Sequence, residues 1–225
     1  MERHFDQEFS GLKDRILAMG KRVENAIEAA IEGLVNRDQK SLEKVHKFEE
    51  EINKNHVEVD EACLKILAKQ SPLATNLRFV ISVIKVNADL ERMGDQAVNI
   101  AQNSRLYIAH EPIKPLVDLP KMAAEVRVMV NEALQSFVSR DVDLAKKVLR
   151  HDDIVDQFKG KIFDELVEIM SKDGKTVKRA LELILIARNF ERLGDHATNI
   201  AEETIFDVSG KDIRHGPRNS SVAAR

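Results

Sequence analysis

The chain has 225 residues with nearly balanced charge, 35 Lys and Arg against 38 Asp and Glu, so that its formal net charge is −3. A protein that binds duplex nucleic acid usually shows a basic excess, so this balance argues against that class. Its one cysteine, Cys63, excludes an internal disulfide framework and a cysteine-rich zinc site, and we expect it in the core.

The composition also bounds the fold class. Glycine and proline are few, at 9 and 5 residues, while Ala, Leu, Ile, Val, Glu and Lys dominate, which favours helices throughout. No apolar run approaches the length of about 18 residues that suggests a membrane-spanning helix, and the first residues lack the apolar core of a signal peptide. We therefore expect a soluble, cytoplasmic protein.

Three long helices are predicted in the first half of the chain. Apolar residues recur every three or four positions over residues 5–34, which predicts a helix that packs against others. Residues 36–38, Asn-Arg-Asp, offer a turn and an N-cap. The second helix is expected to end near Gln70, before Pro72, which can sit in the first turn of the third helix. The third helix should continue to about Ala109.

The second half repeats this plan after a proline-rich segment. Three of the five prolines fall in residues 112–120, which indicates a linker. A helix is then predicted over 121–139. A second begins at a cap formed by Arg140-Asp141 and ends at a break at 172–174, and a third follows the break and runs to about Val208. The fold class predicted is all-α, two tandem three-helix bundles related by internal duplication. They occupy residues 1–110 and 121–208, are joined by a linker at 111–120, and are followed by a tail at 209–225 that we expect to be disordered.

A duplicated motif carries the candidate site. Segments 90–101 and 190–201 share Glu, Arg, Gly, Asp, Ala, Asn, Ile and Ala at the same positions, 100 residues apart. Each copy contains Glu-x-x-x-Asp, formed by Glu91 with Asp95 and by Glu191 with Asp195. In a helix these two carboxylates project from one face, roughly 6 Å apart, and repel each other. A positive group is therefore expected between them.

Acidic residues also interrupt the apolar stripes of other helices. Glu49 stands in the stripe of the second predicted helix, and Asp152 stands at the same step of the fifth. Asp152 forms another acid pair with Asp156, for which Glu49 and Asn53 are the counterparts in the first half. We expect the duplicated motif acids to lie on the apolar seams of their helices as well, in the third helix on the stripe Ile84, Ala88, Glu91, Asp95 and Val98. Acids near a core are costly unless they are paired, protonated or bound to a cation.

Two interpretations of these acids remain open. Antiparallel neighbours would bring two acid pairs together in each bundle, and converging oxygen ligands suit Mg²⁺, Mn²⁺, iron or Ca²⁺, with bridging carboxylates able to hold more than one ion. Alternatively, Arg92 and Arg192 neutralise the acids in structural ion pairs. Gly94 and Gly194, one beside each motif Asp, suggest a close backbone approach or access to the site.

The remaining candidates have structural interpretations. His56 fits a satisfied, partly buried histidine, and His196 fits a surface or interface residue. Glu43-x-x-His46 matches half of a di-iron motif but has no second copy, so we interpret it as a coincidence. The sequence contains no Gly-rich phosphate loop, nucleophile elbow or Cys-x-x-Cys pair, so no catalytic function is predicted.

With its duplicated Glu-Arg-(Met/Leu)-Gly-Asp-x-Ala-x-Asn-Ile-Ala motif, the chain resembles the PhoU family of phosphate-uptake regulators. The segment 71–78, Ser-Pro-Leu-Ala-Thr-Asn-Leu-Arg, and the segment 207–215 support the resemblance, which covers nearly the whole length. Asn53 and Asn76 depart from the acidic pattern, so the first-half site is expected to bind fewer ions or to bind them more weakly. The metal ligands that the resemblance implies are Glu49, Asn53, Glu91, Asp95, Asp152, Asp156, Glu191 and Asp195.

The resemblance also implies a function without turnover. Members of the family are thought to shut down phosphate-starvation signalling when phosphate is plentiful, between the Pst phosphate ABC transporter and the PhoR sensor kinase of the PhoR–PhoB system. The expected partners are a second copy of the chain, a PhoR-type kinase and the Pst ATPase subunit, with no nucleic acid and membrane contact only through partners. One multinuclear metal site is expected in each repeat, with iron as the metal and Mn, Mg, Zn or Ca as alternatives. The competing functions are a metal-free helical scaffold and a carboxylate-bridged metal phosphoesterase.

Overall fold

The computed structural model describes residues 2–70 and 74–213, and this part of the chain contains helices and short connections without a strand. The all-α fold predicted from composition and periodicity is confirmed. The first three helices are α1 (Glu2–Val35), α2 (Gln39–Gln70) and α3 (Ala74–Ile108), and the next three are α4 (Asp118–Ser139), α5 (Val142–Lys172) and α6 (Val177–Ser209), with a 3₁₀ turn at Gly174–Thr176 before α6.

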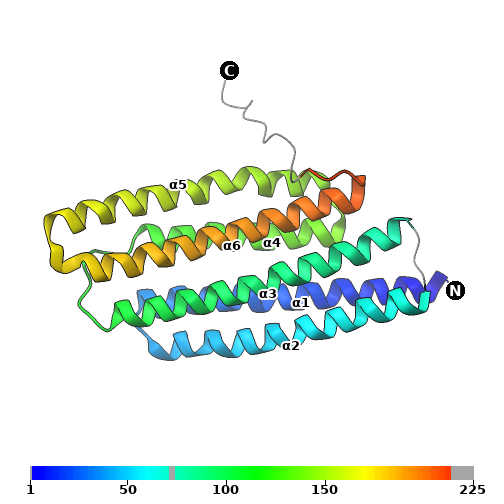
Figure 1. The fold of residues 1–225 in the computed structure, drawn as a ribbon, viewed down its shortest axis with the longest axis horizontal. Coiled ribbons are helices and arrows are strands. Elements are labelled where there is room, and N and C mark those ends of the chain that lie inside the picture. The colour runs from blue at the N-terminus through cyan, green and yellow to red at the C-terminus, as the bar shows by residue number, and fades with distance from the viewer. Residues whose placement is uncertain (1, 71–73, 214–225) are drawn as a thin grey trace, which may run out of the picture.

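The six helices form two three-helix bundles that lie side by side. Helices α1, α2 and α3 pack on one another, as do α4, α5 and α6, and the two bundles meet where α3 packs against α6 and α1 against α4. In Figure 1, α5 and α2 lie at the two outer sides, with α6 and α3 between them. The outer pairs α2/α3 and α5/α6 are therefore equivalent positions in the two bundles.

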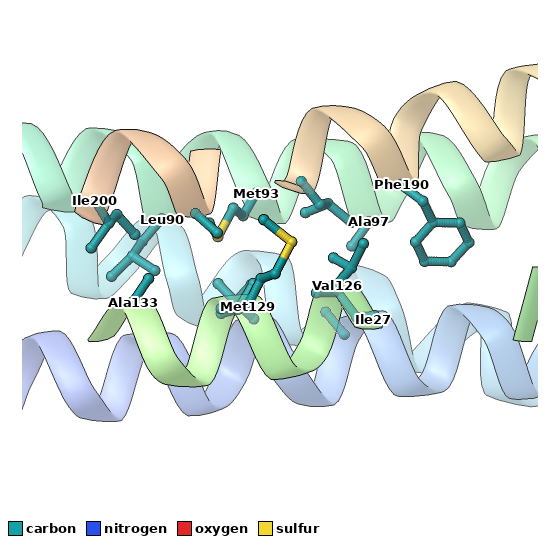
Figure 2. Close-up of a cluster of buried hydrophobic side chains, with 14 of the residues drawn as sticks. Ile27, Leu90, Met93, Ala97, Val126, Met129, Ala133, Phe190 and Ile200 are labelled. Carbon is teal, nitrogen blue, oxygen red and sulfur yellow. The ribbon is translucent and has the colours of Figure 1, made fainter. Parts of the chain in front are cut away.

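The two bundles share one hydrophobic core. Figure 2 shows Ile27 of α1, Met93 of α3, Met129 of α4 and Phe190 of α6 within one cluster, and all four side chains are fully buried. Burial of such side chains stabilises the fold by about 1.5–3 kcal/mol each. The core therefore joins the two repeats along their length.

Most of the predicted apolar stripes are buried. In α1 the stripe from Leu12 to Leu34 faces the core, and the residues spaced by seven from Val45 in α2 and from Val148 in α5 do the same over most of their length. The predicted seam of α3 is wrong. Its buried positions include Leu90, Met93, Gly94, Ala97 and Ile100, whereas the stripe assigned from the sequence, Ile84, Ala88, Glu91, Asp95 and Val98, is half-buried or exposed.

The physical reason is that α3 packs on three sides. It contacts α1, α2 and α6, so its buried face is broad and is centred on the residues beside the motif acids. The duplicated helix α6 shows the same register, with Leu193 and Ala197 buried and Asp195 exposed. The motif carboxylates consequently lie at the rim of the core.

The helix ends agree with the predictions to within one residue except at the starts of α1 and α4, and α1 begins at Glu2, three residues before the predicted start. Asp141 caps α5 as predicted, because its Oδ1 accepts hydrogen bonds from the backbone N–H groups of Asp143 and Leu144. Helix α4 begins at Asp118, three residues before the predicted start. Pro120 lies in its first turn, where backbone N–H groups have no partner within the helix and a proline is tolerated.

The predictions for Pro72 and for most of the tail lie outside the described residues. Ser209 belongs to α6, and Gly210 ends the helix with a φ of 70°. None of the described helices combines the length and apolarity that crossing a membrane would require.

Candidate metal centres

The second repeat gathers acidic side chains between α5 and α6, which run side by side (Figure 1). Glu191 and Asp195 come from α6, and Asp156 comes from α5. Although Asp195 is exposed as a residue, partial desolvation of its carboxyl group, followed by the negative charges of Glu191 and Asp156, raises its pKa. The structure thus places acids from both helices within electrostatic range of one another, as the sequence predicts.

Lys159 supplies a positive charge in this cluster. Its Nζ donates a hydrogen bond of 2.7 Å to Oε1 of Glu191. This hydrogen bond, and then the charges of Glu191, Asp156 and Asp195, raise the pKa of Lys159 against the opposing effect of its burial. In the described part of the chain, Glu191 is paired with Lys159 and not with Arg192. The ion pairs predicted with Arg92 and Arg192 are therefore wrong for the described residues, because neither arginine pairs with a motif carboxylate and Lys159 pairs with Glu191 instead.

The signal for Lys159 is present in the sequence. Lys159 interrupts the apolar stripe of α5 seven residues after Asp152 and three after Asp156. Side chains three apart on a helix are neighbours, so Asp156 and Lys159 share a face. That Glu191 takes the lysine depends on how α5 and α6 face each other, which helical spacing does not give.

Gly194 lets another carboxylate approach the motif. A Cβ atom at Gly194 would lie 3.4 Å from Oδ1 of Asp152 and 3.6 Å from Val155. At Gly94 the corresponding neighbour is Ile52, whose nearest atom would lie 3.2 Å away. Both glycines therefore serve the close approach of a facing helix, and Gly194 alone has a carboxylate oxygen against it.

The first repeat is arranged differently. Asn53 donates a short hydrogen bond through Nδ2 to Oε1 of Glu49, so the amide and the carboxylate partner each other. Glu91 is half-buried and Asp95 is exposed, as are their counterparts in the second repeat. With an amide in place of one carboxylate, this repeat offers one negative charge less than the second.

The donor chemistry of the second repeat fits a hard cation. Carboxylate oxygens are the ligands that Mg²⁺, Ca²⁺ and Mn²⁺ prefer, and iron accepts them too. Within the described residues, however, no group of three or more Asp, Glu, His or Cys side chains lies close enough together to hold an ion in the present rotamers. Lys159 holds the Glu191 carboxylate instead. Metal ligation by the eight residues predicted from the sequence stays a prediction.

The other candidate residues have structural partners. His196 Nδ1 lies 2.9 Å from Oδ1 of Asp89 on α3, so this histidine is an interface residue between the bundles. His56 Nδ1 lies 3.4 Å from the backbone oxygen of Asn87. Cys63 is buried, and its burial raises the pKa of the thiol to about 12, so it remains protonated.

The chain is similar to known proteins over nearly all of its length. A family model described as PhoU domain matches it twice, over residues 16–104 and 119–204. The phosphate-specific transport system accessory protein PhoU homolog of Pseudomonas aeruginosa is 36% identical over 216 residues, which cover 96% of this chain and 89% of that protein. The accessory protein PhoU of Escherichia coli is 33% identical over 213 residues, covering 94% and 88%.

Solved structures agree in fold. The crystal structure of PhoU from Pseudomonas aeruginosa superposes with a TM-score of 0.88 at 36% identity, covering 92% of this chain and 100% of that one. The phosphate transport system regulatory protein PhoU of Streptococcus pneumoniae gives a TM-score of 0.85 at 25% identity, covering 92% and 98%. The two matched segments correspond to the two bundles.

Proposed function

This chain belongs to the PhoU family, and on that basis we propose that it is a non-enzymatic regulator of phosphate uptake that restrains phosphate-starvation signalling. The observation that carries the proposal is the double domain match, together with relatives 33–36% identical over at least 94% of the chain that are named accessory proteins of the phosphate-specific transport system. The role is to keep starvation signalling off while phosphate is plentiful.

The proposed partners follow from this role. The chain acts in the cytoplasm, as a homodimer, between the ATPase subunit of a Pst-type phosphate transporter and a PhoR-type histidine kinase. Long helices with charged outer faces offer extended surfaces for such contacts, and no described helix is suited to crossing the membrane. Contact with the membrane is made through the partners alone.

We propose further that divalent cations, with iron foremost, bind the carboxylates of the two repeats. In the second repeat Asp156, Glu191 and Asp195 would hold the ion, with Asp152 against Gly194 as a further donor. When bound, the metal supplies the positive charge that now comes from Lys159, whose ammonium group would be released from Glu191. The first repeat would hold fewer ions, because Asn53 replaces a carboxylate.

A metal phosphoesterase is the alternative that shares this site. Hydrolysis requires open coordination and a nearby acid or base, and the repeats provide no matched histidine beside the carboxylates. We expect no turnover of a phosphoester panel by metal-loaded protein. Hydrolysis that disappears in Glu191→Ala would establish the enzyme instead.

The regulatory role is tested in a bacterium that lacks its own protein of this kind and carries a phosphate-starvation reporter. Expression of this chain should silence the reporter in phosphate-rich medium and leave its induction under starvation intact. A reporter that stays induced, although the chain is expressed and folded, contradicts the role. Affinity purification after cross-linking tests the partners, and recovery of neither the transporter ATPase nor the kinase contradicts them.

A further inference from the structure

A groove of about 630 Å³ lies between α5 and α6, beside the carboxylates of the second repeat. Its size falls within the range of about 300–1,000 Å³ that is typical of small-molecule sites. Phe163, Ile184 and Ala187 form an apolar part, while Arg188 and Arg192 lie on the α6 side. The groove therefore combines apolar surface with cationic groups.

The two arginines are free to bind an anion. Arg188 and Arg192 are four residues apart, so they project from the same face of α6. Both side chains are exposed, and within the described part of the chain neither makes a hydrogen bond or an ion pair. A guanidinium group presents planar, paired donors that match phosphate oxygens.

The apolar part offers a surface for a ring. Phe163 is 50% exposed and does not belong to the buried core. Large aromatic side chains are more often buried, so this ring is available to a ligand. Next to it, Gly160 lies inside α5, and a Cβ atom there would meet nothing within 4 Å. Glycine lowers helix stability relative to alanine, and packing gives no reason for it here. Without a side chain, the backbone of α5 can be approached closely by a flat group.

The internal duplication shows that this groove is not a by-product of packing two helices. In the first repeat Asn87 donates hydrogen bonds of 2.9 Å to Oδ1 of Asp60 and 3.0 Å to the backbone oxygen of His56, so a polar network occupies the equivalent space. The positions of Gly160, Phe163, Ala187 and Arg188 are taken there by Val57, Asp60, Asn87 and Ala88.

We propose that the groove binds a nucleoside polyphosphate. The phosphates lie on Arg188 and Arg192, and the base lies against Phe163 and the open backbone at Gly160. Glu191 and Asp195 also border the groove, and their negative charges would repel a bare anion. Lys159 neutralises the charge of Glu191, and the magnesium ion of a nucleotide complex would bring a further positive charge to this end of the groove. The groups proposed to contact the phosphates and the base are not predicted metal ligands, although Glu191 and Asp195 border the groove, and the proposal does not depend on the regulatory role.

Calorimetric titration of the full chain with Mg-ATP tests the proposal, with tripolyphosphate and adenosine as the two separate halves of the ligand. ATP should bind at least about tenfold more tightly than either, because each half engages one part of the groove. Absence of ATP binding up to millimolar concentration overturns the proposal. Tripolyphosphate or adenosine binding as tightly as ATP overturns the assignment of both parts to one ligand.

Variants that copy the first repeat locate the site. Arg188→Ala reproduces Ala88 and should weaken ATP binding by about tenfold or more, since a charge-assisted contact is lost. The control is Arg92→Ala, which removes an exposed arginine of the first repeat and should leave ATP affinity unchanged. Equal loss in both variants, or none in Arg188→Ala, contradicts the site.

Gly160→Ala separates binding from folding. The added methyl group fills open space above α5, so it should lower ATP affinity while the midpoint of urea unfolding stays the same or rises. Gly11→Ala makes the same exchange in α1, where a Cβ also meets nothing, and should leave ATP affinity unchanged. Unaltered affinity in Gly160→Ala would remove the ring-binding surface from the proposal.

Discussion

At the scale of single residues, Lys159 competes with any metal ion in the second repeat. Its ammonium group lies 2.7 Å from Glu191 and is favoured by the charges of Asp156 and Asp195. A cation that binds these acids must displace it. If the acids bind a metal ion as proposed, the Lys159–Glu191 ion pair would oppose that binding and weaken it.

Replacing Lys159 by Met is expected to tighten metal binding. The competing charge is gone, so the acids gain more from a divalent cation, while stability without metal falls by about 0–1 kcal/mol because the pair is partly exposed. Manganese titration by calorimetry measures the affinity. Lys147→Met is the control, since it removes an ion pair with Glu132 on another face. Unchanged or weaker manganese binding in Lys159→Met would show that the lysine does not compete.

The thiol of Cys63 should be inert in the folded protein. Burial, together with the nearby charge of Asp60, raises its pKa to about 12, and the thiolate is the form that reacts. Labelling by a chromogenic thiol reagent at neutral pH should therefore be slow in buffer and fast in urea, with a midpoint that follows unfolding. Rapid stoichiometric labelling of the native protein contradicts this placement.

At the scale of elements, the turn between the first and second helices of each repeat contains an arginine that hydrogen-bonds to the end of the third helix. Arg37 and Arg140 both have positive φ, 56° and 59°, a conformation that costs a side-chain-bearing residue about 1 kcal/mol or more. Arg37 Nη2 donates to the backbone oxygens of Ile108 and His110, and Arg140 Nη2 donates to that of Asp207. Each arginine thus ties its turn to the end of the third helix of its own repeat.

Arg140→Ala should destabilise the fold more than Arg37→Ala, by about 2 against about 1 kcal/mol, in urea unfolding. Arg140 also pairs with the Asp207 carboxylate, which is 1% exposed, whereas Arg37 contacts neutral carbonyls. Equal losses would contradict this ranking. Asp207→Asn combined with Arg140→Ala should recover part of the loss, because no buried charge is left unpaired.

We also expect the stability of Arg140→Ala to depend on pH. Burial raises the pKa of Asp207, against the lowering by Arg140, Arg78 and Lys13, so the folded state binds a proton more readily than the unfolded state. The cost of burying this carboxylate is therefore relieved as pH falls through its folded pKa. The stability deficit of Arg140→Ala relative to wild type should shrink between neutral and acidic pH, and a deficit that grows on acidification contradicts the assignment.

The elements themselves could largely be predicted from the sequence. The period of three to four in α1 and the breaks at residues 36–38 and 172–174 are local signals, so helix positions follow from them. The register of α3 could not be predicted, because its buried face depends on the contact with α6, a helix about a hundred residues away. The acid pairs could be predicted because they are spaced four residues apart within one helix. The pairing of Lys159 with Glu191 could not, because it depends on how α5 faces α6.

At the scale of the whole molecule, the two repeats form one packed unit. Fully buried residues of α1, α3, α4 and α6 meet in one cluster (Figure 2). Asp89 of α3 adds polar contacts, since its Oδ1 lies 2.9 Å from His196 Nδ1 and accepts a hydrogen bond of 3.1 Å from Asn199. The repeated motif reveals the duplication in the sequence. The contact between the two repeats could not be predicted, because no local pattern in the sequence indicates which faces of α3 and α6 meet.

A shared core predicts that both repeats unfold together. Tyr107, the one tyrosine in a chain without tryptophan, lies in α3 and reports on the first repeat, while far-ultraviolet circular dichroism reports on all the helices. Urea titrations followed by the two signals should have the same midpoint. Separate midpoints would show that the bundles unfold as independent domains.

We propose that the duplicated motif holds metal ions, and that the first repeat holds fewer of them than the second. Elemental analysis of protein purified without chelator tests it most directly, with Asp195→Asn and Asp95→Asn measured beside the wild type. We predict stoichiometric divalent metal, with iron foremost, that falls in both variants and falls further in Asp195→Asn, because the first repeat has Asn53 in place of a carboxylate. A wild-type protein that carries no stoichiometric metal and cannot be loaded with any would contradict the claim, and the acids would then be structural charges held by Lys159.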